Sequence, residues 1–146
     1  MGAQWNDGRR FKGRVAAVTG GGGTLGGAVA RGFGSEGASV AIGYRSSDAK
    51  AAAVVADLEG GGGQAHAAHL DVTDQDSVDA FVAGVVESYG RLDVLVNAAG
   101  RLDEADTVRF SELDTAAACA LLEVDVIGAM RMCHAVRPRI APFAVE

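Results

Sequence analysis

Hydrophobic and polar positions along the chain alternate between two periods, one typical of buried strands and one typical of amphipathic helices. Short apolar runs are separated by segments of about 10–15 residues in which apolar side chains recur at helical spacing. The pattern predicts strands at residues 15–19, 39–44, 65–70 and 92–96, and helices at 24–35, 47–59, 74–89 and 111–136. Such alternation favours right-handed crossovers between parallel strands. We therefore expect an α/β fold with a doubly wound parallel sheet that has helices on both faces.

A glycine-rich turn joins the first predicted strand to the first predicted helix. It reads Thr19-Gly20-Gly21-Gly22-Gly23-Thr24-Leu25-Gly26-Gly27, and Gly21, Gly23 and Gly26 fit the spacing G-x-G-x-x-G. Because glycine has no side chain, this turn brings backbone N–H groups and the positive end of a helix dipole to one point, and it tolerates positive φ. A phosphate or diphosphate is the ligand that suits such a point.

The second predicted strand ends in Tyr44-Arg45-Ser46, with no carboxylate before Asp48. A dinucleotide site that holds a free ribose 2′-hydroxyl usually places Asp or Glu at this strand end, whereas a guanidinium suits a 2′-phosphate. The residues therefore favour NADP(H) over NAD(H). The alternative is that Arg45 is only a solvent-exposed residue ahead of a helix.

The third and fourth strands also end in groups that suit a ligand, since open α/β sheets bind ligands at the carboxyl ends of their strands. Asp71-Val72 offers a carboxylate beside a backbone N–H for an adenine edge, although Asp is also favoured as a turn or capping residue. Asn97-Ala98-Ala99-Gly100 allows close approach of a ligand, and we expect Asn97 to hydrogen-bond to neighbouring strand ends. The candidate cofactor-binding residues are Gly20, Gly21, Gly22, Gly23, Thr24, Leu25, Gly26, Tyr44, Arg45, Ser46, Asp71, Val72, Asn97, Ala98, Ala99 and Gly100.

Composition and charge narrow the classes of partner. The 146 residues are 49% hydrophobic and 22% charged, as in a folded globular domain, and the net charge of −6 argues against nonspecific nucleic-acid binding. No apolar segment approaches the roughly 20 residues that span a bilayer, and residues 1–10 lack the apolar core of a secretory signal. The two cysteines have neither disulfide nor metal-ligand spacing, and the three histidines are scattered. We expect a cytoplasmic protein with no metal site and no membrane partner.

The ordered set Thr19-Gly20-x-x-x-Thr24-Leu25-Gly26, Asp71-Val72 and Asn97-Ala98-Ala99-Gly100 resembles the short-chain dehydrogenase/reductase family over residues 11–140. The resemblance implies a Rossmann-type fold, a dimer or tetramer, and NAD(P)-dependent hydride transfer between the nicotinamide and a carbonyl or hydroxyl carbon. Two positions depart from the family pattern. The middle glycine falls at Thr24, and Asp125 stands where a Val-Asn-x-x-Gly segment carries the asparagine that is associated with a structural water in the proton relay.

The residues that perform the chemistry of this family are not found in the sequence. The family uses a Ser and a Tyr-x-x-x-Lys pair, but Tyr44 and Tyr89 are each followed four residues later by an aspartate. By comparison with the family, the sequence stops before the strand that delivers the serine. We therefore expect a single NAD(P)-binding domain over residues 1–146, with an incomplete Rossmann-type sheet of about four strands, no catalytic residues and no activity of its own.

Two other functions stay open on the residues alone. One is a non-catalytic nucleotide-binding or interaction module that is completed by another chain. The other, which the wording of residues 97–100 fits less well, is a sugar-nucleotide epimerase of the extended branch, which also requires Tyr-x-x-x-Lys.

A missing fifth strand would have structural consequences. It would leave residues 94–96 as an unprotected sheet edge, and it would expose Leu121, Leu122 and Val124 on the last helix. We expect marginal stability or self-association through that edge.

Overall fold

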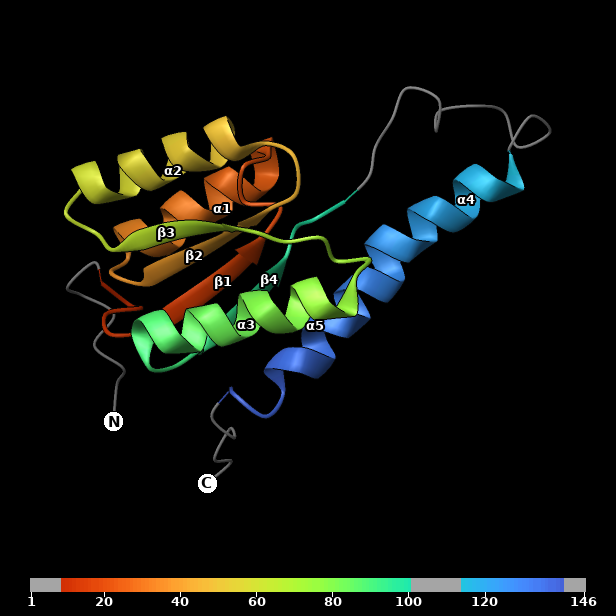
Figure 1. Cartoon of the computed structure of the whole chain (residues 1–146). Helices are drawn as coiled ribbons and strands as arrows, with labels where there is room; N and C mark the ends of the chain where they lie inside the picture. The colour runs from red at the N-terminus through yellow and green to blue at the C-terminus, as the bar shows by residue number, and fades with distance from the viewer. Residues whose placement is uncertain (1–8, 101–113, 141–146) are drawn as a thin grey trace.

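The computed structural model describes residues 9–100 and 114–140, which form a parallel β-sheet with helices on both of its faces (Figure 1). The strands are β1 (Val15–Thr19), β2 (Ser39–Tyr44), β3 (Ala65–His69) and β4 (Val94–Asn97). They lie in the order β3-β2-β1-β4, and every pairing between them is parallel. The predicted α/β fold with a doubly wound, Rossmann-type sheet is confirmed.

Helices α1 and α2 lie on one face of the sheet, and α3 and α5 lie on the other (Figure 1). The helical segments are α1 (Thr24–Ser35), α2 (Asp48–Gly60), α3 (Gln75–Tyr89), α4 (Thr115–Leu122), the π-helix η3 (Glu123–Gly128) and α5 (Ala129–Val136). Helix α4 projects beyond the sheet and buries none of its residues. None of the helices within the described part of the chain is long and apolar enough to cross a bilayer.

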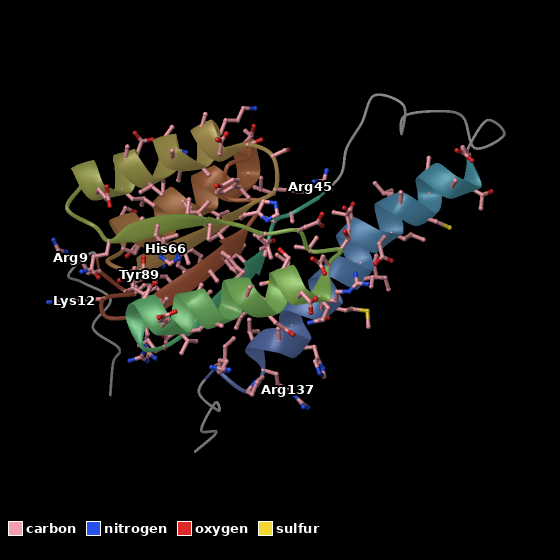
Figure 2. The ribbon with its side chains drawn as sticks, viewed as in Figure 1. Arg9, Lys12, Arg45, His66, Tyr89 and Arg137 are labelled. Atoms are coloured by element: carbon pink, nitrogen blue, oxygen red, sulfur yellow. The ribbon has the colours of Figure 1, made fainter. Side chains whose placement is uncertain are left out.

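The outer strand β3 contacts α3 through the side-chain rings of His66 and Tyr89. The His66 Nδ1 atom lies 3.0 Å from the Tyr89 hydroxyl oxygen, and the two rings stack with their centroids 5.1 Å apart (Figure 2). The Tyr89 hydroxyl also lies 3.4 Å from the carbonyl oxygen of Val40 on β2. Burial lowers the pKa of His66 and raises that of Tyr89, so both rings are favoured in their neutral forms.

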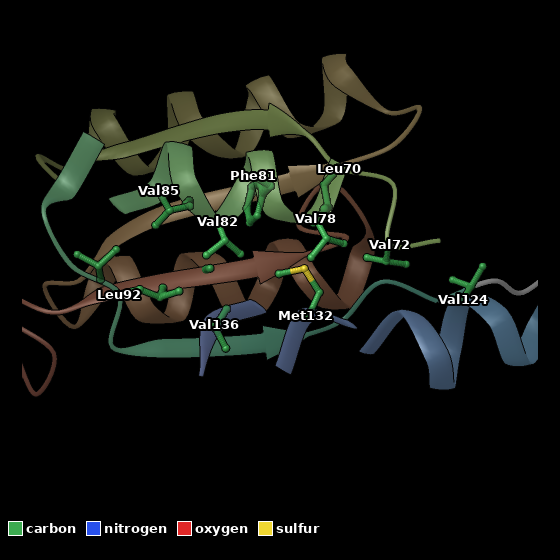
Figure 3. Close-up of a cluster of buried hydrophobic side chains, with 13 residues drawn as sticks. Leu70, Val72, Val78, Phe81, Val82, Val85, Leu92, Val124, Met132 and Val136 are labelled. Atoms are coloured by element: carbon green, nitrogen blue, oxygen red, sulfur yellow. The ribbon is translucent and has the colours of Figure 1, made fainter. Parts of the chain in front are cut away.

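Each face of the sheet has its own apolar core, because successive side chains of a strand point to opposite faces. Val18, Val40 and Ile42 are fully buried in the cluster that includes residues of α1 and α2. The other cluster, drawn in Figure 3, packs α3 and α5 against residues such as Val15 and Ala17. Strand β1 is buried along its whole length, as a central strand of a sheet covered on both faces should be.

The long helix predicted at 111–136 is interrupted by the π-helix η3, and residues 111–113 lie outside the described part of the chain. At the end of η3, Gly128 meets the loop after β3 so closely that a Cβ atom there would lie 2.6 Å from Val72 Cγ2. Val124, in the same π-helix, is only 9% exposed and lies in the cluster that includes Val72. The prediction that Val124 is exposed is therefore wrong, whereas Leu122 is 54% exposed as expected and Leu121 is half-buried.

Strand β4 forms one edge of the sheet within the described residues. Just before this strand, Leu92 forms an isolated parallel bridge with Ile140. The side chains of residues 94–96 are half-buried rather than fully exposed, because α5 packs over this strand. Self-association through this edge stays a prediction.

The start of β4 is fastened to the start of β1 by Asp93. Its side chain is 7% exposed and accepts hydrogen bonds from the Val15 N–H at 2.9 Å, Arg14 Nη1 at 2.8 Å and Arg91 Nε at 2.8 Å. Burial alone would raise the pKa of this carboxyl. The hydrogen bonds from Arg91, Arg14 and Val15, together with the charge of Arg91, outweigh burial and lower the pKa to about 2.

We expect Asp93→Asn to lower the free energy of unfolding by about 2 kcal/mol at neutral pH, which corresponds to the fall in pKa from 3.8 to about 2. Because the folded pKa lies below the unfolded one, the carboxylate stabilises the fold above about pH 4, and this contribution is lost as the pH falls toward 2. Urea unfolding of both proteins between neutral pH and about pH 3 measures the difference.

The matched control is Asp57→Asn, which removes the exposed ion pair with Arg31 and should change stability by less than about 1 kcal/mol. A difference between wild type and Asp93→Asn that does not shrink as the pH falls would contradict this account of Asp93.

Candidate functional site

The carboxyl ends of all four strands open onto one cleft of about 230 Å³. The loops after β1, β2, β3 and β4 each contribute to its walls, as expected at the open edge of a parallel sheet. The cleft is lined by Gly20, Gly22, Gly23, Tyr44, Arg45, Ser46, Ser47, Leu70, Asp71, Val72, Ala98, Ala99, Gly100 and Val124. The structure thus brings most of the predicted site residues together.

The glycine turn between β1 and α1 folds tightly upon itself and upon the loop after β4. Gly20 has φ +63°, and a Cβ atom there would lie 2.7 Å from the Ala98 carbonyl oxygen. A Cβ atom on Gly26 would overlap the carbonyl oxygen of Gly20, and one on Gly21 would lie 2.7 Å from Ile42 Cγ2. Glycine is required at these positions because backbone or packed side chains already fill the space that a side chain would need.

Helix α1 begins in this turn without a side-chain cap. Its N-cap residue Gly23 is extended, with φ −78° and ψ 170°, and makes no side-chain cap hydrogen bond. The first N–H groups of a helix have no partner inside the helix, and they lie at the positive end of its dipole. The turn therefore offers donors and a partial positive charge to an anion in the cleft.

Thr24, which replaces a glycine of the family pattern, fits this turn without strain. It is the first residue of α1, its side chain is exposed, and no described residue other than glycine has a positive φ. The structure therefore requires no glycine at this position.

A buried hydroxyl, that of Thr19, connects the glycine turn to the loop after β4. Thr19 is 1% exposed, and its Oγ1 accepts hydrogen bonds from the Ala98 N–H at 3.0 Å and the Ala99 N–H at 2.9 Å. The same hydroxyl lies 3.5 Å from the Val96 carbonyl oxygen, to which it donates. Sequence reasoning quoted Thr19 as part of a motif but gave it no role. The sequence feature that could have indicated this role is a single hydroxyl at the end of an otherwise apolar strand.

The charged groups of the cleft lie on neighbouring strand ends. Arg45 is exposed at the rim formed by the loop between β2 and α2 (Figure 2). Asp71 is a turn residue, which is the alternative that its residue type allows. Its Oδ1 accepts from the Thr73 hydroxyl at 2.7 Å and from the Thr73 N–H at 2.9 Å. These bonds, helped by the charges of Arg45 and His69, lower the pKa of Asp71 although burial opposes the change.

Some predicted site residues do not line the cleft. Gly21 and Gly26 are buried behind the glycine turn, whereas Thr24 and Leu25 are exposed on α1. The expected contact of Asn97 with strand ends is replaced by a contact with α5, where its Nδ2 atom lies 3.5 Å from Cys133 Sγ.

Three lining residues were missed by sequence reasoning. Ser47 and Leu70 directly adjoin predicted positions, so their place in the chain could have indicated them. Val124 comes from η3, and no local sequence signal points to its position in the cleft.

We expect Thr19→Val to lower the free energy of unfolding by about 1–3 kcal/mol, because it leaves the half-buried N–H groups of Ala98 and Ala99 without this acceptor at nearly constant volume. Thr19→Ser keeps the hydroxyl and should lose less than half as much. The exposed Thr24→Val serves as a control and should change stability by no more than about 0.5 kcal/mol. Denaturant unfolding measures all three, and equal losses for the Val and Ser variants at position 19 would contradict the role of the hydroxyl.

This chain is similar to known proteins in both its sequence and its fold. The family described as short chain dehydrogenase matches residues 14–142. D-threitol dehydrogenase of Mycolicibacterium smegmatis is 34% identical over 133 residues, which cover 90% of this chain and 49% of that protein. The 3-oxoacyl-[acyl-carrier-protein] reductase FabG of Thermotoga maritima is 36% identical over 129 residues, which cover 88% of this chain and 51% of the reductase.

Solved structures agree with these matches. A short chain dehydrogenase from Burkholderia cenocepacia J2315 in complex with NADP superposes with a TM-score of 0.83 at 35% identity, over 90% of this chain and 53% of that one. A dehydrogenase/reductase from Sinorhizobium meliloti 1021 gives a TM-score of 0.86 at 29% identity, over 92% of this chain and 52% of that one. The chain therefore spans about half the length of the relatives it matches. The family match, the parallel sheet and the glycine turn together show that this chain belongs to the short-chain dehydrogenase/reductase family.

Proposed function

We propose that this chain binds NADP(H) in the cleft at the carboxyl edge of its sheet, as the cofactor-binding portion of an oxidoreductase of this family. The observation that carries the proposal is the side-chain-free turn at Gly20 to Gly26, which ends in an uncapped helix N-terminus. Two structural neighbours, from Burkholderia cenocepacia and from a metagenomic source, are complexes with NADP. Bound there, the cofactor would supply a hydride acceptor or donor.

The glycine turn fits the diphosphate bridge of such a cofactor. Methyl groups at positions 20 and 26 would collide with backbone atoms, so the turn keeps its N–H groups at the surface of the cleft with no side chain above them. Gly20, Gly22 and Gly23 form the part of the turn that lines the cleft. The N–H groups of the first turn of α1 would donate to the diphosphate oxygens, as helix N-termini commonly do for phosphate.

The loop after β2 fits the 2′-phosphate that distinguishes NADP from NAD. Arg45 is exposed at the rim, and Ser46 and Ser47 add hydroxyl groups beside it. The next carboxylate along the sequence, that of Asp48, lies at the start of α2, where its Oδ1 accepts from the Ala49 N–H at 2.7 Å. An exposed guanidinium at this strand end favours a doubly charged phosphate over a neutral ribose hydroxyl.

The walls beside β3 fit an adenine ring. Leu70 is 3% exposed and gives this part of the cleft an apolar surface. Asp71 Oδ1 is bound within its turn by Thr73, so Oδ2 and the Val72 N–H are the groups that would meet the edge of the base.

We infer that the full hydride-transfer reaction uses residues outside these 146. The sequence contains no Tyr-x-x-x-Lys with which to hold a proton near the nicotinamide. The chain itself would therefore bind and orient the cofactor, as the single domain expected over residues 1–146. The oxidoreductase reaction, between the nicotinamide and a carbonyl or hydroxyl carbon, would belong to the complete enzyme.

We expect the wild-type chain to bind NADPH more tightly than NADH, and we expect Arg45→Ala to weaken NADPH binding by roughly 10- to 100-fold while leaving NADH nearly unchanged. The reason is the loss of a charge-assisted contact to the 2′-phosphate, which contributes about 1.5–3 kcal/mol. Calorimetric or fluorescence titration measures both affinities.

The matched control is Lys12→Ala, which removes one positive charge at the opposite end of the strands (Figure 2). It should leave both affinities within about twofold of wild type, since charges more than a Debye length apart are largely screened. Equal affinities of the wild type for NADPH and NADH would remove the case for the phosphate contact, and no binding of either cofactor would overturn the proposed function.

We also expect the purified chain to show no turnover of NADPH with a panel of ketones. The absence of Tyr-x-x-x-Lys removes the expected proton donor, and general acid catalysis contributes on the order of 100- to 10,000-fold. Absorbance of NADPH at saturating protein measures the rate. Turnover that persists after contaminating enzymes are removed would contradict the inference that the reaction uses residues outside these 146.

A further inference from the structure

We infer that Arg131 is a positioning residue for recognition of the adenine base. From α5 it holds the peptide unit between Val72 and Thr73, and this peptide orients the groups that would contact the base. The inference rests on the proposed function, because the adenine site is part of the proposed cofactor cleft. It goes beyond that function by assigning a role to a charged side chain that acts through the wall of the cleft.

Arg131 connects the last helical segment to the loop after β3. Its Nη1 atom lies 2.6 Å from Glu123 Oε1 in η3 and 3.5 Å from the Val72 carbonyl oxygen. This nitrogen carries two hydrogens, so it can donate to both acceptors. The contact with Val72 is long for a hydrogen bond, but the charge of the guanidinium strengthens it. The Arg131 side chain is only 25% exposed, so the contact is partly shielded from water.

The peptide unit between Val72 and Thr73 is held on both sides. Its carbonyl oxygen, that of Val72, accepts from Arg131, and its N–H, that of Thr73, donates to Asp71 Oδ1 at 2.9 Å. Because a peptide unit is planar, a rotation that moves the carbonyl group away from Arg131 also moves the N–H group away from Asp71. Arg131 therefore stabilises the orientation in which the Asp71 carboxylate keeps its place in the turn.

The side chain and the carbonyl group of Val72 are both contacted by η3. A Cβ atom on Gly128 would lie 2.6 Å from Val72 Cγ2 and 3.2 Å from the Val72 carbonyl oxygen. Val72 and Val124 belong to one apolar cluster at the same end of the sheet (Figure 3). The close approach at Gly128 and the contact from Arg131 thus meet at the same carbonyl group, and this group belongs to a residue that lines the cleft.

The groups that Arg131 would keep in place are the ones proposed to contact the base. Asp71 Oδ1 is bound by Thr73, so Oδ2 is the acceptor and the Val72 N–H is the donor. Adenine offers an amino group and a ring nitrogen acceptor side by side on one edge, which match this acceptor and this donor. Hypoxanthine offers a carbonyl oxygen and an N–H at the same positions, the reverse arrangement. A site that holds both of its groups in place therefore selects adenine over hypoxanthine.

The test measures dissociation constants for NADPH and for its hypoxanthine analogue, in which only the base differs, by calorimetric titration. We expect the wild type to bind NADPH at least roughly tenfold more tightly than the analogue. Arg131→Met should weaken NADPH by roughly threefold to tenfold and the analogue by less than about twofold. Arg131→Lys keeps a charged donor and should restore most of the selectivity, since a single nitrogen makes both contacts. Arg137→Met, at the exposed C-cap of α5 (Figure 2), is the matched control and should change neither affinity.

A selectivity that Arg131→Met leaves unchanged, including an equal loss of affinity for both ligands, would overturn the inference while leaving NADPH binding intact. Equal affinities of the wild type for the two ligands would also overturn it. If Arg131→Met does not fold, Glu123→Ala decides, because it removes the carboxylate that holds the guanidinium. A selectivity reduced by roughly twofold or more then supports the inference, and an unchanged selectivity overturns it. Failure of the wild type to bind either ligand would overturn both this inference and the proposed function.

Discussion

The Thr19 hydroxyl accepts hydrogen bonds from two consecutive N–H groups of the loop after β4, and this contact fixes how closely that loop approaches the glycine turn. At that separation Gly20 has no room for a side chain, because a Cβ atom there would lie only 2.7 Å from the Ala98 carbonyl oxygen. The carbonyl group of Gly20 likewise leaves no room for a side chain at Gly26. The positions of Thr19, Gly20 and Gly26 therefore depend on one another, and the shape of the cleft floor depends on all three residues.

The electrostatic layout of the cleft follows from where each strand ends. A cation stands after β2, a helix N-terminus after β1, and carboxylates after β3 and beside the loop after β4. Each group lies on a different element, so the spacing between them is set by the parallel pairing of the strands and not by any one loop. The proposed binding of a dinucleotide depends on the cation after β2 and the helix N-terminus after β1.

Much of the fold could be predicted from the sequence because local and tertiary preferences agree. Strand β1 and helix α1 begin and end where the pattern placed them, since an apolar run, a glycine turn and a helical period follow one another without conflict. Helix α3 starts one residue later than predicted because Asp74 caps it, accepting from the Asp76 N–H.

What could not be predicted depends on contacts between distant segments. Val124 is buried in the cluster that includes Val72, a residue far away in the chain. Asn97 faces α5 for a similar reason, since only the packing of that helix on β4 brings Cys133 within reach. The helical period gives no sign of the π-helix η3, so the pattern at 111–136 predicted one unbroken helix.

Strands β1 and β4 are fastened together at both ends, by Asp93 at the amino edge and by Thr19 at the carboxyl edge. A ladder that is closed at each end resists fraying, so these two strands should behave as a single rigid unit when the remainder of the domain fluctuates. The loops that follow these two strands are then held at a fixed separation. A cofactor-binding cleft at the ends of two such strands would keep its dimensions while the surfaces around it change to accept different substrates.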